Sequence, residues 1–172
     1  MLSTTANRIT LLRIALVPVL LVLAYTGHRG WALAVYALAC LSDFLDGYVA
    51  RHYHQSSTAG KFMDPLADKI LVLSVMCFFI ETGQMKGWWV APVLLREFAV
   101  SGLRLIAAER GLVIAAAPSG KIKTAVTMIC LGLMLLFPAG RVLNAVCGGL
   151  TVAVTVWSGI EYFAANAAIL KS

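Results

Sequence analysis

The sequence predicts an all-α polytopic membrane protein with about six transmembrane helices and an N-terminal amphipathic segment, in a single domain over residues 1–172. Hydrophobic residues make up 60% of the chain and charged residues only 13%. Soluble domains have roughly 25% charged residues, so this composition excludes an ordinary soluble protein. The mean hydropathy is +0.87. The apolar residues also fall into successive runs, several of them near the roughly 20 residues needed to cross a bilayer.

The first three apolar runs are residues 9–25, 31–51 and 65–82. Segment 7–13, which reads Asn-Arg-Ile-Thr-Leu-Leu-Arg, is amphipathic and predicts an interfacial turn leading into the first span. The third run begins with Pro65, a residue that the first turn of a helix tolerates. These runs predict three spanning helices in the first half of the chain.

The last three runs complete the predicted bundle. Residues 88–109 form the fourth run, and two tryptophans at its start are typical of the interface between membrane and water. A turn-rich segment, residues 111–120, separates it from the fifth run at 121–137. The sixth run covers residues 142–170. The sequence shows no internal repeat and no linker, which indicates one domain.

The basic residues are divided unequally between the two predicted sides of the membrane. One side holds Arg8, Arg51, Lys61, Arg110, Lys121, Lys123 and Lys171. The other side holds Arg29, Lys86 and Arg141. The positive-inside rule therefore places both termini and the loop after the second run in the cytoplasm. The net charge of +6 is scattered over span ends and forms no basic stripe, so we expect no nucleic-acid partner.

Four carboxylates interrupt the apolar pattern at Asp43, Asp46, Asp64 and Asp68. In helices, the first two lie on one face, and so do the last two. Four ionised aspartates facing lipid would cost on the order of 10 kcal/mol, so they must share a polar cavity. Clustered carboxylates form a hard-oxygen site that suits Mg²⁺ or Mn²⁺. The residues alone leave open a structural acid cluster paired with bases, or a cation transporter that uses the acids as ion ligands.

The spacing D-x2-D-G-x2-A-R-x8-G-x3-D-x3-D over residues 43–68 resembles the signature of the CDP-alcohol phosphotransferases. The resemblance implies a six-helix, homodimeric membrane enzyme in which an alcohol attacks the β-phosphorus of a CDP-linked lipid and releases CMP. It also implies two Mg²⁺ or Mn²⁺ ions bound by the four aspartates, with Asp68 as the general base as well. The CDP-lipid-binding residues implied are Gly47, Ala50, Arg51, Gly60, Ser57 and Asn7.

Three flanking stretches, residues 7–13, 96–104 and 119–124, resemble those of bacterial family members that form phosphatidylglycerophosphate. This likeness implies CDP-diacylglycerol as donor, glycerol 3-phosphate as acceptor, and a multi-pass position in the bacterial inner (cytoplasmic) membrane with the active site facing the cytoplasm. An anionic acceptor needs fixed cations. The candidates for binding the acceptor phosphate are Arg104, Arg110, Lys121 and Lys123.

Two alternatives remain open at the level of sequence. The signature is shared by enzymes with different acceptors, so inositol phosphate and serine compete with glycerol 3-phosphate. The basic residues at span ends also have a simpler explanation, namely anchoring on the cytoplasmic side. A transporter would be favoured by broken helices or a repeated acid pattern, and the sequence shows neither.

Overall fold

The part of the chain that the structure describes forms six α-helices. The computed structural model describes the backbone of residues 5–52, 58–112, 114 and 117–167 and, within these, the side chains of residues 9–42, 66–112, 114 and 117–167. The helices are α1 (Thr5–Tyr25), α2 (Arg29–His52), α3 (Thr58–Glu81), α4 (Gly87–Glu109), α5 (Pro118–Leu136) and α6 (Arg141–Ala165). No strand occurs in the described ranges, so the all-α prediction is confirmed.

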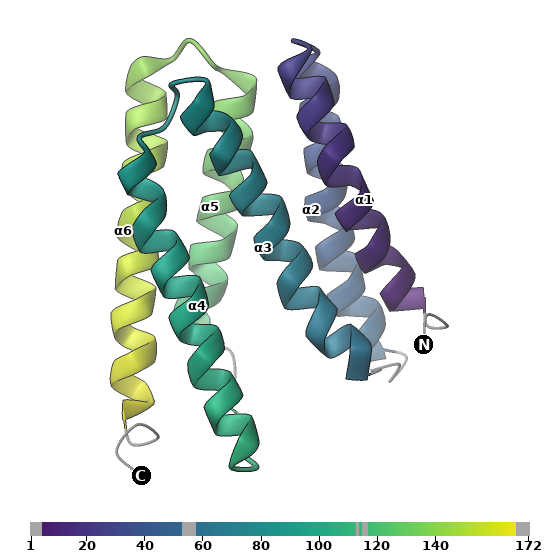
Figure 1. The fold of residues 1–172 in the computed structure, drawn as a ribbon, viewed down its shortest axis with the longest axis vertical. Coiled ribbons are helices and arrows are strands. Elements are labelled where there is room, and N and C mark those ends of the chain that lie inside the picture. Colours follow the sequence, from purple (N-terminus) through teal and green to yellow (C-terminus); the bar gives the residue numbers. More distant parts are fainter. Residues whose placement is uncertain (1–4, 53–57, 113, 115–116, 168–172) are drawn as a thin grey trace.

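Successive helices run in opposite directions and form two groups (Figure 1). Helix α1 packs against α2 and α3, while α6 packs against α4 and α5. Helix α5 also contacts α2 and α3 and thereby joins the groups. The start of α1, the end of α2, the start of α3 and the end of α6 all lie at the lower end in Figure 1. The acid-bearing parts of α2 and α3 therefore lie at one end of the bundle.

Several helices begin before the predicted apolar runs, and two of these starts involve a proline. Helix α3 begins at Thr58 rather than at Pro65, so this proline lies inside the helix. Pro18 and Pro92 also lie inside helices. A proline removes one backbone hydrogen bond, a loss that membrane helices tolerate. Helix α5 begins at Pro118, because the proline ring is already set for the first helical turn and needs no N–H acceptor there.

Within the described residues, α5 and α6 are long and apolar enough to cross a membrane. The apolar parts of the first two helices, Ile9–Tyr25 and Arg29–Ser42, are shorter. Many large apolar side chains face outward, including Leu95, Phe98 and Ile160, each about two-thirds exposed or more. An apolar exterior is expected of a protein surrounded by lipid. The structure therefore supports a membrane protein, and the count of six spans stays a prediction.

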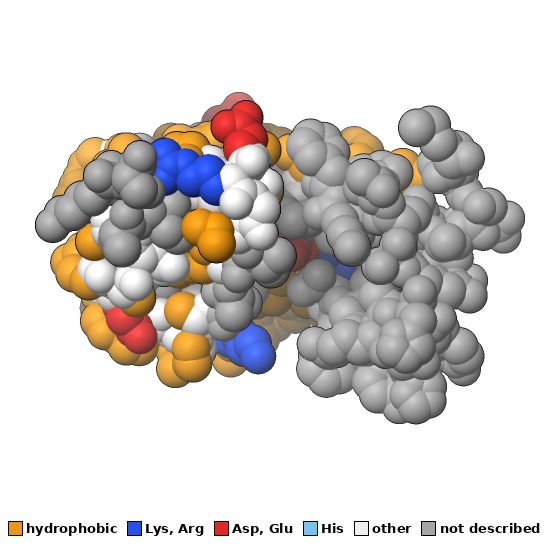
Figure 2. Space-filling view, turned by 90° about the horizontal axis from the view of Figure 1, so that it is seen from below, with side chains coloured by type: hydrophobic (Ala, Val, Ile, Leu, Met, Phe, Trp, Pro, Cys, Tyr) orange, Lys and Arg blue, Asp and Glu red, His pale blue; other side chains and the backbone are white. Residues whose placement is uncertain are grey.

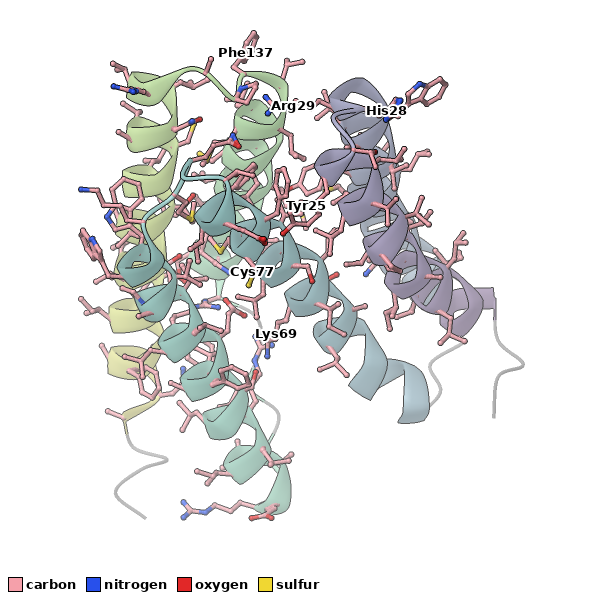
Figure 3. The ribbon with its side chains drawn as sticks, turned by 45° about the horizontal axis from the view of Figure 1, so that its top comes forward. Tyr25, His28, Arg29, Lys69, Cys77 and Phe137 are labelled. Carbon is pink, nitrogen blue, oxygen red and sulfur yellow. The ribbon has the colours of Figure 1, made fainter. Side chains whose placement is uncertain are left out.

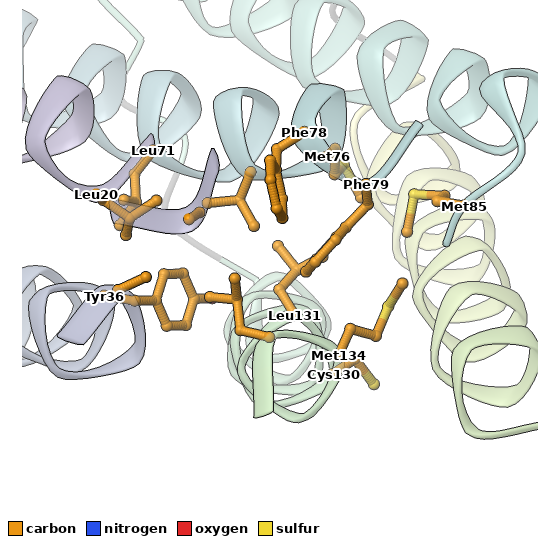
Figure 4. Packing of buried hydrophobic residues seen from close by; sticks show 14 of the residues in the cluster. Leu20, Tyr36, Leu71, Met76, Phe78, Phe79, Met85, Cys130, Leu131 and Met134 are labelled. Atoms are coloured by element: carbon orange, nitrogen blue, oxygen red, sulfur yellow. The ribbon is translucent and has the colours of Figure 1, made fainter. Parts of the chain in front are cut away.

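The apolar core lies where the two helix groups meet (Figure 4). Leu20, Tyr36, Phe79 and Leu131 come from four different helices and are buried in one cluster. The Tyr36 hydroxyl donates a hydrogen bond to the carbonyl oxygen of Met128 at 3.0 Å, which ties α2 to α5. This core holds the acid-bearing helices against the second group.

Close packing of α6 depends on a glycine. A Cβ atom at Gly148 would lie 2.1 Å from Cζ3 of Trp89, whereas a Cβ at the neighbouring Gly149 would meet nothing within 4 Å. Small residues allow this close approach between membrane helices. Gly148 is therefore required by packing, and Gly149 is not.

We predict that Gly148→Ala destabilises the protein because Trp89 has to move. Overpacking of this kind costs about 1–3 kcal/mol, and each kcal/mol lowers the melting temperature by roughly 2–4 °C in a chain of this size. Thermal unfolding in detergent measures the effect. The matched control Gly149→Ala should melt at or above the wild-type temperature, and equal melting of both variants would contradict the packing argument.

Candidate active site

The backbones of α2 and α3 place the acids in two pairs. Helix α2 is helical through Asp43 and Asp46, and α3 through Asp64 and Asp68, so the members of each pair lie one helical turn apart. Of the four side chains, only that of Asp68 is among the described ones. The side chains of Asp43, Asp46 and Asp64 are not described. The same holds for the predicted CDP-lipid-binding residues, which are Gly47, Ala50, Arg51, Gly60, Ser57 and Asn7. Their roles stay predictions.

Asp68 forms an ion pair with a residue that the site prediction did not include. Nη1 of Arg13 lies 2.7 Å from Oδ1 of Asp68. The Arg13 side chain is 0% exposed and that of Asp68 is 34% exposed. Sequence reasoning assigned Arg13 to an amphipathic segment at the bilayer surface, but the structure buries it. The sequence did contain a signal for this burial, because a charged residue between apolar neighbours indicates a paired or functional position inside the bundle.

A second charged group is centred on Glu97. Its Oε1 lies 2.5 Å from Nζ of Lys123 and 3.1 Å from Nη1 of Arg96. Nη2 of Arg96 donates to the hydroxyl of Ser158 at 2.7 Å. All three charged side chains are mostly buried, and together with Ser158 they connect α4, α5 and α6. The single negative charge of Glu97 is thus shared between two cations inside the second helix group.

Lys69 links the acid pair of α3 to this group. It follows Asp68 in the chain and reaches from α3 toward α4 (Figure 3). Its ammonium donates a hydrogen bond to the hydroxyl of Ser101. It also interacts electrostatically with Glu97 and with the cations Arg96, Arg104 and Lys123. We call Lys69, Arg96, Arg104 and Lys123, together with Glu97, the basic cluster.

Arg104 is held by an aromatic residue of α6. Its Nε donates to the hydroxyl of Tyr162 at 3.1 Å, and its guanidinium carbon lies 5.6 Å from the centre of the same ring. Arg104 also lines a cavity of about 300 Å³ beside the chain that follows α4. Arg110 and Lys121 are exposed near the ends of α4 and α5. The structure thus places Arg104 and Lys123 in the basic cluster, with Arg110 and Lys121 farther along the same two helices.

The basic cluster carries an excess of positive charge. Arg96, Lys123 and Lys69 lie around the Glu97 carboxylate, and Arg104 lies near Lys69, so the described cluster holds four cations and one carboxylate. Seen from the lower end, acidic and basic side chains lie at depth near the middle of the molecule (Figure 2). A group of cations with one carboxylate among them attracts anions.

The described side chains include no group of three or more His, Cys, Asp and Glu residues close enough to hold a metal ion. Three of the four predicted ligands lie outside this range, so the metal prediction is untested. The four aspartates belong to α2, which ends at the lower end of the bundle, and to α3, which begins there. Carboxylate oxygens are the ligands that Mg²⁺ and Mn²⁺ prefer, so the donor set fits such ions.

Acid-bearing helices α2 and α3 and a cluster of cations on α3, α4 and α5 define a helical, membrane-type protein with a site suited to phosphorylated substrates. Residues 3–157 match the family model described as CDP-alcohol phosphatidyltransferase, and the chain belongs to this family. It is therefore a transferase enzyme. The match confirms the family predicted from the motif and speaks against the cation transporter.

Curated relatives match over nearly the whole chain. A Bacillus subtilis (strain 168) protein named CDP-diacylglycerol–glycerol-3-phosphate 3-phosphatidyltransferase is 36% identical over 193 residues, covering 96% of each chain. A Mycobacterium tuberculosis (strain ATCC 25618 / H37Rv) protein named probable phosphatidylglycerophosphate synthase is 38% identical over 94% of this chain and 81% of its own length. A Salmonella typhimurium protein with the same name as the Bacillus one is 37% identical over 91% of each chain.

We predict that Glu97→Gln strongly destabilises the protein, because Arg96 and Lys123 would stay buried without a carboxylate. Removing one partner of a buried ion pair costs about 3–5 kcal/mol. Thermal unfolding of the purified protein checks this. Glu109→Gln, an exposed change on the same helix, serves as the control. A Glu97→Gln variant that melts like the control would show that the ion pairs add little stability.

Proposed function

We propose that the enzyme transfers the phosphatidyl group from CDP-diacylglycerol to sn-glycerol 3-phosphate, giving phosphatidylglycerophosphate and CMP. The names of the relatives support this donor and this acceptor. The structural observation that carries the proposal is the basic cluster. One of its cations, Lys69, directly follows Asp68 in the chain. An acceptor with a phosphate group would balance the positive charge of the cluster, whereas serine would not.

We assign the acceptor phosphate to cations on three helices. The sequence-based set consists of Arg104, Arg110, Lys121 and Lys123, and the position of Lys69 adds this residue to it. Lys69 is adjacent to Asp68, so a phosphate bound by the cluster would keep the acceptor close to the acids. Such positioning makes the attack effectively intramolecular, which is a large source of rate enhancement.

The donor would bind at the acid-bearing ends of α2 and α3. We propose that Gly47, Ala50, Arg51 and Gly60 line the CDP group, with Ser57 and Asn7 beside them. Residues with little or no side chain allow a nucleotide to approach a helix backbone closely. We further propose that Asp43, Asp46, Asp64 and Asp68 hold two Mg²⁺ or Mn²⁺ ions. When bound, these ions would neutralise the pyrophosphate and polarise the reacting phosphorus.

In the proposed reaction the acceptor hydroxyl oxygen attacks the β-phosphorus of CDP-diacylglycerol. A new phosphorus–oxygen bond forms, the bond to the bridging oxygen breaks, and CMP leaves with the electron pair. Asp68 accepts the proton of the hydroxyl. A general base must lie within hydrogen-bond reach of this proton, and the 34% exposure of Asp68 leaves its carboxylate accessible from one side.

We propose a bacterial inner (cytoplasmic) membrane protein with six spans, in which the lower end of the bundle faces the cytoplasm. The positive-inside rule supports this orientation. The turns at the upper end include Arg29 and Lys86, while Arg110 and Lys121 belong to the lower end. Both termini would then be cytoplasmic. The outward-facing apolar side chains suit contact with lipid and, over part of this surface, with a second copy in a homodimer.

The proposed function predicts acceptor-dependent release of CMP. Purified protein in detergent, supplied with CDP-diacylglycerol and Mg²⁺ or Mn²⁺, should release CMP with glycerol 3-phosphate. It should release little with inositol phosphate or serine, and chelation of the divalent cation should stop the reaction. Activity with serine but none with glycerol 3-phosphate would refute the proposed acceptor while leaving the family intact.

We predict that Asp68→Asn abolishes turnover and leaves binding of the CDP-lipid largely intact, because the amide cannot accept the proton. Single-turnover release of CMP measures the chemical step, and competition by CMP measures binding of the nucleotide. The melting temperature shows whether the variant is folded, since Arg13 loses the negative charge of Asp68. Substantial residual turnover would remove Asp68 as the base.

A further inference from the structure

Arg13 is the largest of the fully buried side chains described in this protein. It lies on α1, a helix that carries none of the predicted metal ligands. A guanidinium inside an apolar bundle is costly unless its charge and its N–H groups are satisfied. The position of this residue therefore points to a specific role.

The contacts of Arg13 reach both acid-bearing helices. Nη1 meets Oδ1 of Asp68 at 2.7 Å, and Nε donates to the hydroxyl of Ser42 at 3.4 Å. The Ser42 hydroxyl donates in turn to the carbonyl oxygen of Ala39 at 2.8 Å, which fixes its orientation. Ser42 directly precedes Asp43, the first acid of the motif, and Asp68 is the last. One side chain thus connects the two ends of the motif.

The geometry of α1 supports this connection. Helix α1 packs against both α2 and α3, so Arg13 extends from a third helix toward the two that carry the acids. A guanidinium is a planar fork whose N–H groups point in fixed directions. It can therefore set the distance and the orientation between Ser42 and Asp68, which a flexible ammonium group cannot do in the same way.

We propose that Arg13 is a positioning residue that orients the Asp68 carboxylate for metal binding and proton transfer. This inference rests on the proposed function, which makes Asp68 a metal ligand and the base. Arg13 is completely buried, so it acts through Asp68 and does not touch the substrates. Replacing a residue that hydrogen-bonds to a metal ligand typically lowers metal affinity or activity by about 10–100-fold.

The competing explanation is a structural ion pair that contributes only to stability. The two explanations differ in what Arg13→Lys changes. The lysine keeps the positive charge but loses the fork, so the electrostatic effect on the site is largely retained while the orientation of Asp68 is lost. A positioning role then affects metal binding and kcat, whereas a structural role affects only the melting temperature.

The test compares full-length wild type with Arg13→Lys in detergent. Electron paramagnetic resonance follows the loss of the free Mn²⁺ signal on binding, which needs no turnover. We expect binding of Mn²⁺ to weaken by about tenfold or more and kcat to fall by about 10–100-fold. The KM values for both substrates should stay within about twofold, because no substrate contact is removed.

Arg96→Lys is the matched control, since Arg96 is also mostly buried and paired with a carboxylate, but on α4. It should lower the melting temperature and leave the affinity for Mn²⁺ at the wild-type value. Wild-type affinity and kcat in Arg13→Lys would overturn the proposal, as would an equal loss of Mn²⁺ affinity in both variants. If Arg13→Lys does not fold, Ser42→Ala removes the Nε contact of Arg13 together with the hydroxyl's own bond within α2, and leaves the Arg13–Asp68 pair in place. A measurable loss of Mn²⁺ affinity would then support the proposal, and none would overturn it.

The outcomes also separate this inference from the proposed function. A wild-type protein that makes phosphatidylglycerophosphate, with Arg13→Lys indistinguishable from it, would overturn only the role of Arg13. Weaker Mn²⁺ binding by Arg13→Lys in a protein that does not use glycerol 3-phosphate would overturn only the acceptor. The binding measurement contains no acceptor, so it is independent of that assignment.

Discussion

The structure depends on the pairing of charges inside an apolar helix bundle. A single ion buried without a partner would be costly enough to destabilise a chain of this size. Arg13 is paired with Asp68 in the first helix group, and Glu97 lies between Arg96 and Lys123 in the second. The Arg13–Asp68 pair joins α1 to α3, and the Glu97–Lys123 pair joins α4 to α5, so these contacts satisfy the charges and also fix the arrangement of the bundle.

Helix α3 connects the two charged groups. Asp68 points to Arg13 on α1, while the next residue, Lys69, reaches Ser101 on α4. Consecutive residues on a helix point in directions about 100° apart, so neighbours in the chain can serve different partners. This divergence places the Asp68 carboxylate and the basic cluster on different sides of one helix, an arrangement that the proposed function uses for its donor and its phosphorylated acceptor.

Sequence reasoning succeeded where spacing alone carries the information. Two helical acid pairs, separated by a short loop, follow from the positions of Asp43 through Asp68, and the family match agrees with the motif. It failed where a local rule competes with the rest of the fold. Pro65 suggests a helix start, yet α3 begins at Thr58. The neighbours of Arg13 in the chain suggest a position at the bilayer surface, yet Arg13 pairs with Asp68, 55 residues away in the chain.

By itself the sequence determined the all-helical class, the apolar character, the acid motif and the family, because these depend on composition and on spacing within single helices. Only the tertiary structure decided which cation faces which carboxylate. Arg13, Glu97 and Lys69 acquire their roles from side chains on other helices, and no local pattern encodes such pairings. They follow instead from how α1 packs against α2 and α3, and from how α4, α5 and α6 pack together.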